Sequence, residues 1–276
     1  MDPLQGSNTT GTINVPSDLG EGTLTTKMTD QKSPLGTSKD DFLQGIQHSL
    51  GKSSRSPKQI YSHLQENLQD LEERANLLQH RLESIQPELL TTLADTASAC
   101  GWHVYRLSTE QDALGQVSEI VKSKGIQYAV RSQEPIFDSL PIDKLLADLE
   151  INMTVLAHDS GLSTHDIREK ASLADIGITG ANYAIAETGS VVVLPRQGVS
   201  RLVSLMPQIH LAIVKSKQIL ENLEDLFLLR RIAFMKEENW GNYMNFITGP
   251  SRTGDIEQTI IVGVHGPKEV HLLILE

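Results

Sequence analysis

Apolar residues in the first hundred positions recur at helical spacing. They predict a short helix from Asp40 to Leu50, and Ser56 followed by Pro57 predicts the start of a longer one, since Ser caps helices and Pro suits their first turn. Steps of three and four in the longer helix form an a/d heptad seam that ends at Pro87. The seam comprises Tyr61, Leu64, Leu68, Leu71, Ala75, Leu78, Leu82 and Ile85. It indicates a helical arm that either packs across its own domain or pairs with another chain.

From Glu88 onward, short apolar runs alternate with amphipathic segments. The predicted strands of this region are 104–107, 128–130 and 153–156, and the predicted helices are 88–100, 110–124, 141–149 and 163–173. This alternation favours an α/β fold with a mainly parallel sheet flanked by helices. Later strands are predicted at 184–186, 190–194, 211–214, 244–247 and 271–275, with helices over 218–236 and 255–262.

The composition changes along the chain and suggests three parts. Residues 1–40 are rich in Ser, Thr, Gly, Pro and Asp, and they hold few large apolar side chains. Such a segment cannot bury enough surface to offset its ordering entropy, so we expect a disordered tail. We therefore predict a tail over 1–40, an N-terminal helical region over 41–87 and an α/β domain over 88–276.

Charge and cysteine content exclude several classes of function. The net charge of −11 argues against nucleic acid as a main partner, because phosphate binding requires clustered Lys and Arg. The single cysteine, Cys100, excludes an intrachain disulfide and a cluster ligated by four thiolates. No apolar run approaches the ~18 residues of a membrane span, and the sequence lacks a signal-peptide pattern, so a reducing cytoplasm is expected.

A single carboxylate, Glu187, stands in a small, apolar run. The turn Thr188-Gly189 follows it, and then a run typical of a buried strand. A carboxyl group in an apolar corner suits a general acid, a base or a nucleophile. The alternative is a structural Glu bonded to the N–H groups of the turn. Thr179, between two glycines, is placed to bond a ligand oxygen.

The segment from Gly249 to Asp255 resembles an anion-binding loop. Ser251 and Thr253 flank Arg252, and a predicted helix follows. A helix N-terminus offers unpaired N–H groups, and an Arg beside it can clamp a carboxylate or phosphate. The alternative is ordinary helix capping, with Arg252 in solvent.

Two further positions are candidates on weaker grounds. His265, between a strand and a Gly-Pro turn, is a candidate base, ligand or proton donor, or else a structural histidine of a tight turn. Arg201 is placed to reach the same pocket, and His210 is a similar but weaker candidate. The nine histidines lack metal-ligand spacing, so no metal site is expected.

Several of these pieces together resemble the LUD domain of lactate utilization proteins. They are Asp175-Ile-Gly-Ile-Thr179, Ala184-Ile-Ala-Glu-Thr-Gly189, Arg201 with Ser204 to Pro207 and His210, Gly249-Pro-Ser-Arg-Thr253, Asp255-Ile-Glu257 and Val262-Gly-Val-His-Gly-Pro267. The resemblance implies a fold similar to the sugar-phosphate isomerase and CoA-transferase superfamily. It also implies oxidation of L-lactate to pyruvate by a three-protein system whose partner subunits carry the iron–sulfur clusters.

The leading interpretation is the subunit of a lactate-oxidising complex that itself lacks a cofactor. Its predicted catalytic residues are Glu187 and His265, and its predicted ligands for a small carboxylate are Thr179, Thr188, Gly189, Arg201, Ser251, Arg252 and Thr253. A homo-oligomer is compatible with the helical arm. The alternatives are a stand-alone transferase- or isomerase-like enzyme that uses Glu187, and a ligand-binding regulator without turnover.

Overall fold

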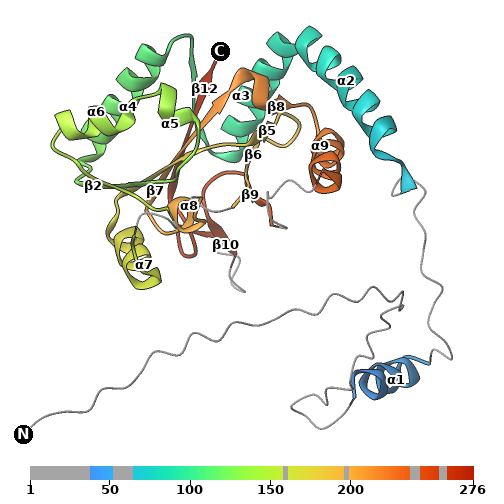
Figure 1. The fold of residues 1–276 in the computed structure, drawn as a ribbon. Coiled ribbons are helices and arrows are strands. Elements are labelled where there is room, and N and C mark those ends of the chain that lie inside the picture. Colours follow the sequence, from blue (N-terminus) through green and yellow to red (C-terminus); the bar gives the residue numbers. More distant parts are fainter. Residues whose placement is uncertain (1–37, 52–64, 158–160, 196–198, 237–242, 255–259) are drawn as a thin grey trace, which may run out of the picture. The chain divides into compact units, whose positions relative to one another are not determined.

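The computed structural model describes residues 38–51, 65–157, 161–195, 199–236, 243–254 and 260–276 (Figure 1). The chain divides into two compact units, residues 1–61 and 62–276. In the first unit, α1 (Lys39–Ser49) confirms the predicted short helix, and the Ser38 side chain caps it by accepting the Asp41 N–H at 3.1 Å. The helix start predicted at Ser56 and almost all of the expected tail lie outside the described residues.

A parallel sheet forms the centre of the second unit. Its six strands follow the order β1 (His103–Leu107), β12 (Glu269–Leu275), β7 (Ile209–Lys215), β4 (Ile176–Gly180), β2 (Tyr128–Arg131) and β3 (Asn152–Val155). Every neighbouring pair in this sheet is parallel. The inner strands are nearly continuous apolar runs because layers on both faces bury them. The predicted α/β class with a parallel sheet is confirmed.

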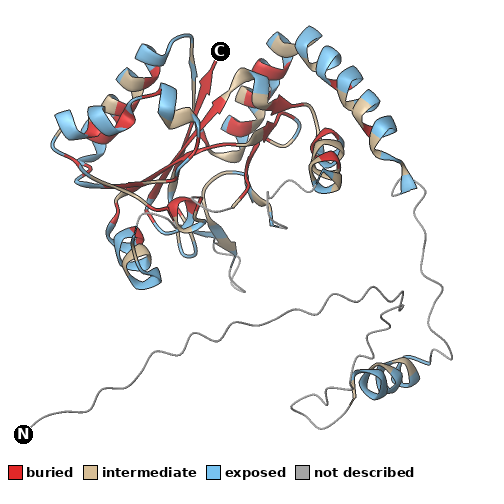
Figure 2. Ribbon diagram, viewed as in Figure 1, coloured by how far each residue is buried: buried red, intermediate tan, exposed pale blue. Residues whose placement is uncertain are grey.

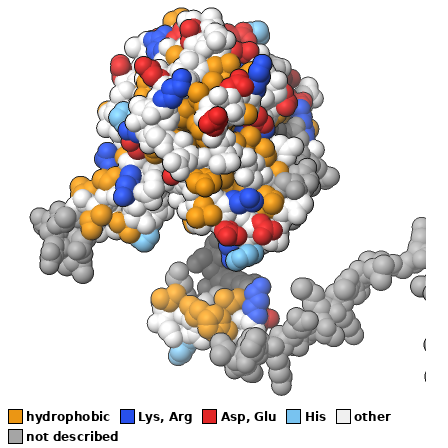
Figure 3. Space-filling model, turned by 90° about the vertical axis from the view of Figure 1, so that its left-hand side faces the viewer, with side chains coloured by type: hydrophobic (Ala, Val, Ile, Leu, Met, Phe, Trp, Pro, Cys, Tyr) orange, Lys and Arg blue, Asp and Glu red, His pale blue; other side chains and the backbone are white. Residues whose placement is uncertain are grey.

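One face of this sheet is covered by helices. The helices α4 (Glu110–Lys124) and α6 (Ile142–Asp148) pack their apolar sides onto β4, β7 and β12 (Figure 1). The shorter α5 (Ile136–Ser139) precedes α6, while α7 (Thr164–Leu173) and α8 (Leu202–Leu205) share a smaller core with β2. On the outer side of these helices, Figure 3 shows acidic and basic side chains interspersed.

The opposite face carries α3 (Gln86–Cys100) and a second sheet. This sheet has four strands in the order β8 (Ile219–Leu220), β5 (Tyr183–Ile185), β6 (Ser190–Val193) and β9 (Asn245–Ile247). Apolar residues of α3, β5 and β6 pack with β7 and β12 in one core. The helix α9 (Leu223–Met235) places Leu226 against the second sheet, so buried residues line both sheets (Figure 2).

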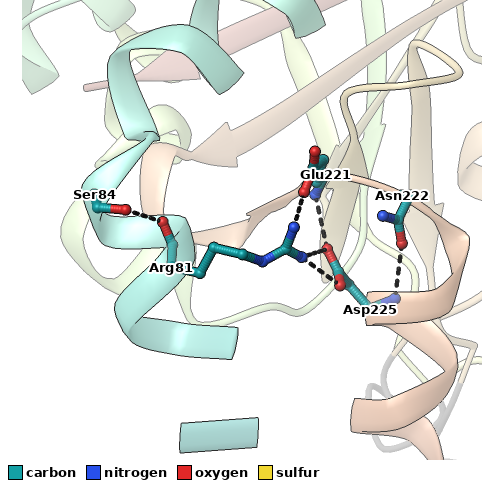
Figure 4. Close-up of polar contacts among 5 residues, drawn as sticks. All are labelled: Arg81, Ser84, Glu221, Asn222 and Asp225. Atoms are coloured by element: carbon teal, nitrogen blue, oxygen red, sulfur yellow. Dashed lines mark hydrogen bonds and ion pairs between the residues drawn. The ribbon is translucent and has the colours of Figure 1, made fainter. Parts of the chain in front are cut away.

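The helix α2 (Leu68–Ser84) packs on its own unit through the predicted seam. The predicted helix is not continuous from Ser56, because Asn67 is an extended N-cap and α2 begins at Leu68. Leu71 and Leu78 are buried, whereas Tyr61 and Leu64 lie outside the described residues. Arg81 reaches from α2 to the start of α9, where it pairs with Glu221 and donates to both Asp225 oxygens at 2.9 and 3.1 Å (Figure 4). Of the two alternatives for the seam, packing within its own unit is therefore the one seen in the described residues.

The central strand β4 is the largest departure from the predicted elements. The predicted ligand Thr179 lies here between two glycines, and no strand is among the predictions, but Ile176–Gly180 is buried throughout and lies between β2 and β7. A Cβ on Gly177 would lie 1.8 Å from the Val203 carbonyl oxygen. The glycine therefore serves the close packing of α8 on the sheet, and not an approach to a ligand.

Two helix predictions near the C-terminus need correction. The helix predicted over 218–236 is confirmed as α9, but it begins at Leu223, because Asn222 caps α9 and the preceding Ile219–Leu220 pairs with β5. The helix predicted over 255–262 is contradicted at its end, where β11 (Ile260–Val262) pairs antiparallel with β10 (Arg252–Gly254). The β-branched residues of β11 favour a strand. Among the described residues, no helix is both long and apolar enough to cross a bilayer.

We predict that Gly189→Ala destabilises the protein. Gly189 has a φ of +63°, and a Cβ there would lie 2.6 Å from the Ala97 backbone nitrogen on α3. Positive φ and overpacking together cost about 2–4 kcal/mol. Urea unfolding measures the loss, and Gly115→Ala is the control: it lies within α4 with nothing within 4 Å and should stabilise by about 0.5–1 kcal/mol. Equal midpoints for Gly189→Ala and the native protein would contradict the packing described here.

Candidate functional site

Several predicted ligand residues gather where α3 ends, beside the amino ends of the parallel strands. The Cys100 thiol contacts the Thr188 carbonyl oxygen at 3.6 Å, and the Arg252 Nη2 donates to the Cys100 carbonyl at 3.2 Å. Gly189 packs on α3, and a Cβ on Gly249 would lie 2.3 Å from the Cys100 carbonyl oxygen. We call Thr188, Gly189, Gly249, Ser251 and Arg252 the amino-edge cluster. Its contacts fasten the second sheet and β10 to α3.

The two C-terminal motifs also meet at this edge. The Ser251 N–H donates to the Pro267 carbonyl at 2.9 Å, and the Gly263 N–H donates to the Ser251 carbonyl at 2.8 Å. Arg252 and Thr253 belong to β10 and pair with β11, so the predicted helix N-terminus for anion binding is wrong. His265 is exposed. The structure thus brings the motifs together, while their roles as ligands or base stay predictions.

Arg201 and Thr179 occupy different surroundings. Arg201 is exposed at the start of α8, and its guanidinium carbon lies 4.8 Å from the centre of the Tyr243 ring. The hydroxyl of Thr179 is buried and lies 2.9 Å from Nε2 of the fully buried His210. This pair belongs to the core between the two sheets, so Thr179 does not face the other predicted ligands.

Glu187 lines a cavity of about 480 Å³ between α2, α3 and the start of α9. Glu187 is exposed, so the prediction that its carboxyl group lies in an apolar corner is wrong. Glu88 and Glu221 line the same cavity, and Arg81 is the basic residue among its lining residues. Glu221 and Asp225 already pair with that guanidinium (Figure 4). The excess of carboxylates makes this cavity unfavourable for an anionic ligand.

A smaller pocket lies at the opposite, carboxyl edge of the parallel sheet. After β2 the chain runs outward to β3, then returns to β4 on the other side of β2 and continues through β7 to β12. This reversal is a topological switch point, where open α/β sheets bind ligands outside the carboxyl ends of their strands. The pocket has a volume of about 300 Å³. We call it the carboxyl-edge pocket; Glu134, Pro135, Ile136, Gly180, Ala181, Asn182, Tyr183, Lys215, Lys217 and Gln218 line it.

One wall of the carboxyl-edge pocket presents the buried carboxylate of Glu134. Its Oε2 accepts the Gly180 N–H at 2.7 Å and the hydroxyl hydrogen of Ser132. Arg131, at the end of β2, holds this turn by donating to Asp143 at 2.6 Å and to the Ser132 carbonyl at 2.9 Å. The carboxylate is therefore fixed in direction by Ser132, directly after β2, and by Gly180 at the end of β4.

The opposite wall is cationic. Lys215 ends β7, and Lys217 follows it in the next turn. Within the described residues, neither lysine forms an ion pair. Gln218 holds the wall in place, because its Oε1 accepts the Lys215 N–H at 2.8 Å and its Nε2 donates to the Ala181 carbonyl at 2.7 Å. Lysines facing a small pocket favour a small anion, and Glu134 adds a base on the other side.

Comparison with known proteins agrees with the sequence motifs. Residues 90–275 match the LUD domain, which is more than half of the chain. The chain belongs to the LUD domain family. Lactate utilization protein C of Halalkalibacterium halodurans is 31% identical over 169 residues, which cover 61% of this chain and 71% of that protein.

Two further proteins are similar to this chain over different shares of their lengths. Lactate utilization protein B of Shouchella clausii is 25% identical over 237 residues, which cover 68% of this chain and 48% of that protein. A solved structure of a duf162 family protein from Deinococcus radiodurans is 19% identical, with a TM-score of 0.49, and covers 69% of this chain and 98% of that one.

None of the predicted ligand or catalytic residues of this LUD protein lines the carboxyl-edge pocket. Sequence reasoning missed Glu134 and Lys215 because each is a single charged residue without a motif around it. A signal was nevertheless present, since each follows a predicted strand, 128–130 or 211–214. Carboxyl ends of neighbouring parallel strands meet at one edge of a sheet. Because β4 was not predicted from the sequence, it was not apparent that these two strands both pair with β4.

We predict that the protein loses stability in acid because of His210, a histidine buried in the core. Burial, with a smaller contribution from His271, lowers the pKa of His210 to about 3. Below pH ~6.5 the unfolded chain therefore binds a proton that the folded chain does not, and stability falls as the pH falls.

We expect His210→Gln to remove about 2 kcal/mol of the stability change between pH 7 and pH 5, because Gln does not titrate. Urea unfolding of both proteins at each pH measures the two changes, so an overall destabilisation by the substitution does not affect the comparison. Parallel pH profiles for the two proteins would contradict a neutral, buried His210.

Proposed function

We propose that this LUD protein is a component of a cytoplasmic system that uses L-lactate by oxidising it to pyruvate. The names of its relatives, lactate utilization proteins B and C, support the role in lactate utilization. The single cysteine cannot ligate a four-thiolate cluster, which supports the proposal that partner subunits carry the iron–sulfur clusters. The chain acts as the subunit that holds the small carboxylate.

The observation that carries the binding role is the placement of two lysines in the carboxyl-edge pocket. Both residues line a volume of about 300 Å³, at the small end of ligand pockets and suited to a three-carbon acid. By contrast, the Arg252 guanidinium already donates to the Cys100 carbonyl, and Glu187 lies among other carboxylates. We therefore assign the lactate or pyruvate carboxylate to Lys215 and Lys217.

We expect Lys215→Met to weaken the binding of L-lactate and pyruvate at least tenfold, a loss of about 1.4 kcal/mol, because it removes an ammonium from the pocket and keeps the aliphatic stem. Calorimetric titration measures both dissociation constants. Lys144→Met, on the exposed side of α6, is the matched control and should bind as the native protein does.

Titration of Arg252→Ala separates the two possible locations. Unchanged binding in this variant supports the carboxyl-edge pocket. Binding that is lost in Arg252→Ala and kept in Lys215→Met would move the site to the amino-edge cluster. If the native protein binds neither acid, the proposed carboxylate-binding role is wrong.

A further inference from the structure

The two chemically distinct walls of the carboxyl-edge pocket lie on either side of one strand end. Lys215 ends β7, which pairs with β4, and Glu134 lies in the turn after β2, where its carboxylate accepts the N–H of Gly180 at the end of β4. The end of β4 between them is Gly180, whose missing side chain leaves room for Glu134: a Cβ there would lie 3.2 Å from the Glu134 Cβ. A short acid whose carboxylate lies at Lys215 extends toward Glu134.

The surroundings of Glu134 fix the direction of its carboxylate. The Gly180 N–H and the Ser132 hydroxyl both donate to its Oε2. Lys215 and Lys217 line the same pocket. With 7% of its surface exposed, Glu134 is screened from bulk water while it lines the pocket. These are the properties of a general base.

We infer that Glu134 removes a proton from C3 of a 2-oxo acid held in the carboxyl-edge pocket. The inference rests on the proposed function, since the acid must first bind through Lys215 and Lys217. The C3–H bond breaks, the proton passes to the Glu134 carboxylate, and the electron pair forms the C2–C3 double bond of an enolate. The charge that develops on the C2 oxygen is stabilised by the lysine ammonium groups. Return of a proton restores the acid, so the step needs no oxidant.

This step predicts exchange of the pyruvate methyl hydrogens in deuterated water. Proton NMR of pyruvate with the full chain should show the methyl signal decaying faster than in buffer alone. We expect Glu134→Gln to slow the exchange by about 10²-fold or more, the usual contribution of a general base. Gln retains an oxygen that accepts the Gly180 N–H, so the pocket should keep its shape and still bind pyruvate in calorimetry.

Asp138→Asn is the matched control, because this carboxylate lies on the nearby α5 but is exposed and does not line the pocket. It should exchange pyruvate at the native rate. Ser132→Ala provides a second test if Glu134→Gln fails to fold. Loss of the hydroxyl that orients Oε2 should slow exchange and leave pyruvate binding in place.

The outcomes separate this inference from the proposed function. Pyruvate binding without any acceleration of exchange would overturn the role of Glu134 and leave the binding role intact. Exchange that proceeds at the native rate in folded Glu134→Gln would also overturn it. If the native protein neither binds pyruvate nor exchanges its methyl hydrogens, both the inference and the binding role are wrong. Exchange that Glu134→Gln and Lys215→Met each abolish supports both.

Discussion

The hydrogen bond from the Gly180 N–H to the Glu134 carboxylate is the contact on which the candidate site depends. It joins the turn after β2 to the carboxyl end of β4 at the switch point of the sheet, with an N···O distance of 2.7 Å. A bond of this kind to a charged group contributes about 1.5–3 kcal/mol, and the Ser132 hydroxyl adds a second donor. Together these donors hold a buried carboxylate opposite two lysines. The chemistry proposed for the pocket depends on this oriented carboxylate.

The contacts at the amino edge of the sheet are structural, whereas the chemistry that we propose lies at the carboxyl edge. At the amino edge, Gly189, Gly249 and Arg252 bring the second sheet and the β10–β11 hairpin against the end of α3. Glycines in these motifs serve close packing, as Gly177 does beneath α8. At the carboxyl edge, a cavity is lined by residues of both charges. The most recognisable motifs of the chain therefore lie apart from its most suitable anion pocket.

The fold was largely predictable from the sequence, and the site was not. Apolar runs such as Leu211–Val214 identify strands buried on both faces, and caps such as Ser163 mark helix starts. Strand β4 escaped detection because Gly177 and Gly180 interrupt its β-branched residues and are depleted in strands, although packing makes it central. Without β4, nothing in the sequence indicates that Glu134 and Lys215 border one pocket. Long-range pairing of strands, and not local composition, brings them together.

A crystal structure of the full chain with L-lactate would test the location of the site most directly. We expect the ligand to lie in the carboxyl-edge pocket, with its carboxylate at Lys215 and its other end toward Glu134. Lactate bound at Arg252 and the end of α3, or beside Glu187, would show that the carboxyl-edge pocket is not the binding site. In either of those cases the motifs recognised in the sequence would be the binding site itself, and Glu134 would be a structural residue of the β2–β4 junction.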